Sequence, residues 1–136
     1  MVTKNNFSFK RKSILRLKSE IQELFDNAER VDYVDFKILY YPKNVASSGN
    51  FQVFISVPKK RLNKATDRNL VKRRIKESIR LNSKDLKLLC INNKISLFYG
   101  VIWNRDYICE YKIIEQNIVL SLQDIYNKIY EKTQNP

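Results

Sequence analysis

Apolar residues recur along the chain with two different spacings. In the N-terminal part they fall three or four positions apart, which is typical of a helix with one buried face, and we expect that helix over residues 13–27. The segments 35–41 and 51–57 are instead rich in β-branched and aromatic residues. Because turn-forming residues separate them, they predict the two strands of a hairpin. A further short strand fits near residues 30–33.

The C-terminal part of the chain predicts helices and one more strand. Thr66 or Asp67 can cap a helix. The buried stripe of that helix is expected to be Val71, Ile75, Ser78, Ile79 and Asn82. Residues 83–92 add a short helical turn, and residues 95–103 predict a mostly buried strand. A long amphipathic helix is expected over residues 111–132, and its buried face would be Ile114, Ile118, Leu122, Ile125 and Ile129.

This order of elements predicts an α+β fold. Because a helix separates the strands 51–57 and 95–103, we expect them to be parallel neighbours with that helix as the crossover. The predicted order is α-β-β-(β)-α-β-α, an α-β sandwich in which helices cover the sheet mainly on one side. A length of 136 residues fits one domain over residues 1–136. We expect residues 1–12 to form a basic N-terminal segment and residues 133–136 a disordered tail.

Composition narrows the function. The 26 Lys and Arg against 14 Asp and Glu give a formal charge of +12, so the expected partner is a polyanion. The chain has no histidine, which removes imidazole bases and imidazole metal ligands. Cys90 and Cys109 lack the spacing of a zinc or redox pair and are expected to be reduced core residues. Without a signal peptide or a membrane-spanning apolar run, we expect a cytoplasmic protein that binds no membrane.

Most of the positive charge lies in two segments. Residues 58–80 carry ten Lys and Arg against two acids, and residues 1–18 carry six and no acid. Like charges at helical spacings without acidic partners favour phosphate binding, although a charged, solvated helix face is the alternative. The side-chain amide of Asn69, which lies among these charges, could hydrogen-bond a sugar hydroxyl or a base edge. The expected RNA-binding residues are Lys59, Lys60, Arg61, Lys64, Arg68, Asn69, Lys72, Arg73, Arg74, Lys76 and Arg80.

The strand 51–57 has a second face that carries Phe54 and Ser56. If helices leave this face open, it would line a groove beside Lys59 and Lys60, with an aromatic ring and cations that suit a single-stranded nucleic acid. The alternative is that Phe54 packs beneath the N-terminal helix.

The sequence VPKKRLNKATDRNLVKRRIKESIRLN, residues 57–82, resembles the signature of the bacterial ribonuclease P protein component. The similarity extends over residues 9–130, including Ile21 to Phe25 in the first helix, but only residues 53–82 are diagnostic. In the family's R-N-R motif, Arg68 and Asn69 are retained and Leu70 replaces the second arginine.

The resemblance implies the protein subunit of a ribonucleoprotein endonuclease that removes the 5′ leader from precursor tRNA. The RNA subunit of such an enzyme holds the catalytic Mg²⁺, and the chain alone is expected to be inactive. The protein would bind the catalytic RNA through residues 59–80, and the leader in a groove between the first helix and the sheet. The family fold also implies a left-handed crossover between the parallel strands. By position, the leader groove would contain Ile21, Phe25, Leu39, Phe54 and Ser56.

Three other classes of protein fit less well. A structural ribosomal or other RNA-binding protein would share the charge and lack only the signature. An autonomous metal nuclease needs clustered carboxylates, whereas Asp67 and Glu77 stand ten positions apart among arginines. A helix-turn-helix protein would place a partner helix beside the basic one, where this sequence predicts strands. The sequence leaves the oligomeric state open.

Overall fold

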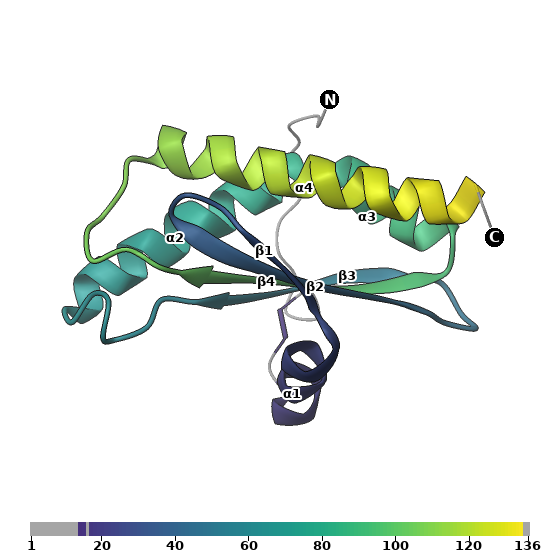
Figure 1. Ribbon diagram of the computed structural model, residues 1–136, viewed down its shortest axis with the longest axis horizontal. Helices are drawn as coiled ribbons and strands as arrows, with labels where there is room; N and C mark the ends of the chain where they lie inside the picture. The colour runs from purple at the N-terminus through teal and green to yellow at the C-terminus, as the bar shows by residue number, and fades with distance from the viewer. Residues whose placement is uncertain (1–13, 16, 135–136) are drawn as a thin grey trace.

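The computed structural model describes residues 14, 15 and 17–134, and it has a mixed sheet between two helical layers (Figure 1). Helices α2, α3 and α4 cover one face of the sheet, and α1 lies on the other face. The helices are α1 (Lys18–Asn27), α2 (Ala65–Asn82), α3 (Lys84–Asn92) and α4 (Tyr111–Gln134). The strands are β1 (Glu29–Asp32), β2 (Phe36–Asn44), β3 (Asn50–Ser56) and β4 (Ile95–Trp103).

The strands lie in the order β1-β2-β4-β3, and β4 runs parallel to β3 and antiparallel to β2. The predicted parallel pair, with a helical crossover between its strands, is therefore confirmed. The left-handed sense of that crossover stays a prediction. The predicted short strand is β1, which forms an antiparallel pair with β2.

The predicted hairpin of residues 35–41 and 51–57 is wrong, because β4 lies between β2 and β3. Eight of the nine residues of β4 are buried, so this strand gains most from a central position with neighbours on both edges. The hairpin in the structure joins β1 to β2, where the Tyr33 N–H donates to the carbonyl of Phe36 at 2.9 Å.

The first helix begins later than residue 13, where the prediction placed it. Ile14 forms a parallel bridge with Val53, and the Leu15 N–H donates to the Val53 carbonyl at 2.9 Å. These backbone contacts hold residues 14 and 15 extended along β3, and α1 starts at Lys18. The predicted basic segment 1–12 lies outside the described residues.

Two other predicted boundaries are wrong. The N-cap of α2 is Lys64, without a side-chain cap bond, so Thr66 and Asp67 lie inside the first turn. Helix α4 continues through Thr133 and Gln134, where the sequence predicted a disordered tail. Residues 135–136 lie outside the part of the chain that the structure describes.

The core has two parts, one on each face of the sheet. The larger part lies beneath α2, α3 and α4 and buries every residue predicted for the inner stripes of α2 and α4. The smaller part lies beneath α1 and is formed by Leu15, Leu24, Leu39 and Phe98. Burial of each such side chain stabilises the fold by about 1.5–3 kcal/mol. Because the smaller core contains fewer buried side chains, it holds α1 less firmly than the larger core holds the other three helices.

Candidate functional site

An open cavity of about 760 Å³ lies between β3 and α2. We call it the β3–α2 groove. Because β3 is an edge strand, the groove follows the edge of the sheet, with residues 14 and 15 beside it. Its lining residues are Ile14, Leu15, Val53, Phe54, Ile55, Thr66, Asn69, Lys72, Arg73 and Lys76. One wall is therefore apolar, and the other is basic and polar.

The basic wall follows from the helical repeat of α2. Asn69, Lys72, Arg73 and Lys76 occupy positions i, i+3, i+4 and i+7, which lie on one face of a helix. The inner stripe of α2 packs on the sheet, so this adjoining face looks along the edge strand. Four of the predicted RNA-binding residues thus come together in one groove.

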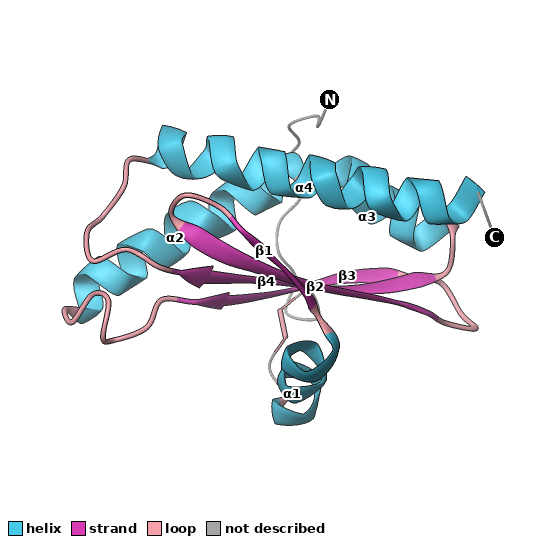
Figure 2. Cartoon of the chain, in the orientation of Figure 1, coloured by secondary structure: helices cyan, strands magenta, loops and turns pink. Residues whose placement is uncertain are grey.

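Two predicted RNA-binding arginines have partners within the fold. The Arg61 guanidinium donates to Asn104 Oδ1 at 2.7 Å and lies 3.3 Å from Asp106 Oδ1. The Arg74 guanidinium donates to the Cys109 carbonyl at 2.6 Å. Figure 2 shows that the β3–α2 and β4–α4 connections lie at the same end of the molecule. Arg61 therefore ties the two connections together, and Arg74 ties α2 to the β4–α4 connection.

Arg68 and Arg80 also have intramolecular partners. The Arg68 guanidinium donates to the carbonyls of Leu62 and Asn63 at 2.9 and 2.8 Å, which ties down the connection before α2. The Arg80 guanidinium donates to the Glu77 carboxylate, and this hydrogen bond lowers the pKa of Glu77. Both arginines therefore form hydrogen bonds to other residues of the basic segment 58–80 and stabilise its conformation.

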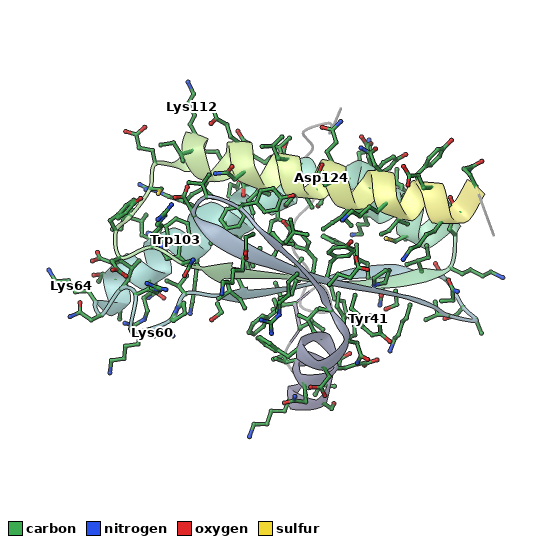
Figure 3. The ribbon with its side chains drawn as sticks, in the orientation of Figure 1. Tyr41, Lys60, Lys64, Trp103, Lys112 and Asp124 are labelled. Atoms are coloured by element: carbon green, nitrogen blue, oxygen red, sulfur yellow. The ribbon has the colours of Figure 1, made fainter. Side chains whose placement is uncertain are left out.

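The remaining predicted cations point to solvent or into the groove. Figure 3 shows Lys60 and Lys64 at the end of the molecule where α2 begins, with their side chains directed outward. Within the described part of the chain, none of these cations has a hydrogen bond or ion pair, so all are available to anionic groups. They are Lys59, Lys60, Lys64, Lys72, Arg73 and Lys76.

The predicted leader-groove residues lie close together, but not all of them border a cavity. Leu39 is only 1% exposed beneath α1, so its placement in an open groove is wrong. Ile21 also packs in that small core, and the Phe25 ring meets the Phe54 ring edge-on at 5.8 Å. Because α1 fills the space above the sheet here, the cavity lies at the edge of the sheet instead.

Both alternatives predicted for Phe54, packing beneath the first helix and lining a groove, apply in part. It packs beneath α1 against Phe25, and it also lines the β3–α2 groove. Ser56 is half-buried at the end of β3 and is not part of the groove lining. Phe54 is thus the one predicted leader residue that borders the groove.

Sequence reasoning missed several groove residues. Ile14 and Leu15 were assigned to a helix, and their pairing with β3 depends on a contact 39 positions away. Thr66 was considered only as a helix cap. Its spacing of three from Asn69 is the signal that could have placed it on the basic face.

The described residues contain no exposed thiol, no metal-binding cluster and no helix that could span a membrane. Cys90 and Cys109 are buried and unpaired with one another, as predicted, and burial raises the pKa of Cys90 to about 12. No cluster of three or more metal-binding side chains occurs in residues 14, 15 and 17–134. In the same part of the chain, every helix is too short or too polar to cross a membrane.

The fold and the groove define a small α+β protein with an open basic groove along a sheet edge. The family model described as Ribonuclease P matches residues 9–101. This chain belongs to the ribonuclease P protein family. It is 41% identical over 93 residues to the ribonuclease P protein component of Onion yellows phytoplasma (strain OY-M), covering 68% of this chain and 59% of that protein.

Other comparisons agree. The ribonuclease P protein component of Phytoplasma australiense is 42% identical over 77 residues, covering 57% of this chain and 64% of the relative. The matches thus span about 60% of the length of these relatives. The ribonuclease P protein of Staphylococcus aureus has the same fold, with a TM-score of 0.60 at 17% identity over 84% of this chain and 97% of that one. The ribonuclease P protein of Thermotoga maritima also has this fold, with a TM-score of 0.61 at 20% identity over 81% of this chain and 94% of that one.

Proposed function

We propose that this chain is the protein subunit of the ribonucleoprotein that removes the 5′ leader from precursor tRNA. Family membership supports the assignment to ribonuclease P. The observation that carries the role in substrate binding is the β3–α2 groove, which is lined both by Phe54 and by a row of cations on α2. An aromatic platform beside a track of positive charge suits successive bases and phosphates of a single strand.

The two parts of the basic segment would contact different RNAs. Lys60 and Lys64 are directed outward at the end of the molecule where α2 begins (Figure 3), and the neighbouring Lys59 is exposed, so these three lysines suit the phosphates of the catalytic RNA. Lys72, Arg73 and Lys76 instead border the groove and suit the leader. This division revises the sequence-based hypothesis, in which the whole of residues 59–80 contacted the catalytic RNA.

The chain would bind and orient RNA rather than cleave it. It contains no histidine to act as a base. The groove presents ammonium, guanidinium, amide and hydroxyl groups, which suit phosphate oxygens, and its described lining has no carboxylate to hold a divalent cation. The Mg²⁺ that activates water for phosphodiester hydrolysis would therefore be held by the RNA subunit.

A comparison of two substrates tests the groove assignment. Phe54→Ala should weaken binding of precursor tRNA to the preassembled enzyme by about 1–3 kcal/mol, the value of one base stacked on a ring. Binding of mature tRNA, which has no leader, should be unchanged. Affinity for each RNA is measured by titration with labelled RNA.

Phe25→Ala is the matched control. It removes the same ring contact, 5.8 Å between centroids, but no lining residue of the groove. It should therefore leave the affinity for both RNAs nearly unchanged. Equal losses for precursor and mature tRNA with Phe54→Ala, or equal losses with both variants, would contradict the assignment of Phe54 to the leader.

A further inference from the structure

The outer face of α4 carries a row of uncharged residues. They recur at alternating spacings of three and four, and we call them the α4 seam. The members are Ile113, Gln116, Leu120, Gln123, Asn127 and Tyr130. Three of them are large and exposed, with 43% of Ile113, 53% of Leu120 and 46% of Tyr130 accessible. The seam is thus an unusual surface for a protein in which 29% of residues are charged.

The seam plays no part in the core of this chain. The buried face of α4, from Ile114 to Ile129, packs on the sheet and the neighbouring helices. Figure 1 shows α4 along the outer side of the helical layer, and Figure 3 shows Lys112 near its start pointing away from the sheet. The alternation of three and four is the spacing by which one helix packs along another.

Charge favours a second copy of the chain as the partner of this face. Helix α4 contains three lysines and three acidic residues, so it is neutral in a chain of net charge +12. Two strongly positive molecules repel least where the approaching faces are neutral. An RNA partner, in contrast, would favour the basic groove.

The seam is complementary to itself in one arrangement. If two copies of α4 run antiparallel about a two-fold axis between Ser121 and Leu122, Ile113 lies opposite Tyr130 of the second copy. In the same register, Lys112 lies opposite Glu131 of the second copy. Ile113 and Tyr130 then meet at both ends of the seam, Leu120 lies opposite Gln123 near its centre, and opposite charges face one another at both ends, as an isologous contact allows.

We propose that the α4 seam is an antiparallel, two-fold interface between two copies of this chain. One helix of 24 residues, about 36 Å long, offers a small contact area, so the association is weak and depends on concentration. The inference does not rest on the proposed function, because it concerns the protein without RNA.

Sedimentation equilibrium of the RNA-free chain tests the interface. The chain should show a monomer–dimer equilibrium, and Leu120→Glu should weaken it by about thirtyfold or more, because a charge is then buried near the centre of the contact. Leu88→Glu is the matched control, since Leu88 on α3 is similarly exposed and lies outside the seam. A chain that stays monomeric, or a dimer that Leu120→Glu leaves intact, overturns the proposal.

Two further measurements test the register without relying on Leu120. A mixture of Ile113→Cys and Tyr130→Cys proteins should form a disulfide between the variants, whereas Ile113→Cys alone should not, because residues 113 and 130 lie about 25 Å apart along the helix. Lys112→Glu should weaken the dimer, and adding Glu131→Lys should restore it. Absence of the mixed disulfide or of the rescue contradicts the antiparallel register.

Discussion

Cations on α2 have two separate roles, which follow from their partners. Arg74 donates to the Cys109 carbonyl at 2.6 Å and joins α2 to the connection before α4. Lys72 has no such bond within the described residues and borders the groove. Arg74 therefore contributes to the fold, and Lys72 is available to RNA.

Substitution by alanine should separate these roles. Arg74→Ala should lower the free energy of unfolding by about 1–2 kcal/mol, because a half-buried carbonyl loses its charged donor. Lys72→Ala should leave stability within about 0.5 kcal/mol and weaken binding of precursor tRNA, because one phosphate contact is lost. Urea denaturation and RNA titration measure the two effects. Equal destabilisation by both variants would show that this division is wrong.

The buried stripes show what could be predicted for single residues. The five residues chosen on α2 are all buried, because a helical period depends only on the local sequence. Leu39 was misplaced because its burial depends on α1 crossing the other face of the sheet, a contact that no spacing within β2 reveals. The hydrogen bonds of Arg61 and Arg74 were missed for the same reason, since their partners lie 35 to 45 positions away.

Gly49 allows β3 to start close to the backbone of α3 and β4. A Cβ at position 49 would lie 2.1 Å from the Cys90 carbonyl oxygen and 2.3 Å from that of Ile95. Both are backbone atoms, so the elements would have to separate. The sequence indicated only a turn at this position.

Gly49→Ala should therefore destabilise the protein by about 3 kcal/mol or more, because no flexible side chain can yield. Gly100→Ala is the comparison, since the nearest atom there, at 3.0 Å, belongs to the Leu24 side chain. Its cost should be about 1 kcal/mol. Thermal or urea unfolding measures both variants, and a Gly49→Ala protein as stable as the Gly100→Ala protein would contradict this packing.

The elements themselves were predictable to different degrees. Helices α2 and α4 and the strands have strong periods, and the structure contains them close to the expected ranges. The pairing of strands was not predictable in full, because β4 enters between β2 and β3 after two intervening helices. The start of α1 was wrong because backbone pairing with Val53 outweighs the helical spacing of Ile14. Tertiary contacts thus decide what local patterns leave open.

Across the whole molecule, burial holds several tyrosines in their neutral form. Burial raises the pKa of Tyr33, Tyr40, Tyr99 and Tyr111 above the usual value near 10. Hydrogen bonds from Tyr33 to Asp124 and from Tyr40 to Glu29 add to the effect. As the pH rises, the unfolded chain would therefore lose these tyrosine protons at a lower pH than the folded chain.

The free energy of unfolding should therefore be nearly constant from about pH 6 to about pH 8 and fall as the pH rises above about 9 to 10. The sign follows from the raised pKa values, since above about pH 10 the folded state binds more protons than the unfolded state. Urea denaturation between these pH values measures the trend. Stability that rises with pH in this range would contradict the burial of these groups.

The distribution of charge and the groove together support a role as the protein subunit of ribonuclease P, and cleavage of precursor tRNA tests it most directly. The measurement compares the catalytic RNA with and without this chain at a magnesium concentration too low for the RNA alone. We predict that the protein restores removal of the 5′ leader, whereas the protein without RNA cleaves nothing. Cleavage by the protein alone, or no gain when it joins the catalytic RNA, would contradict the account.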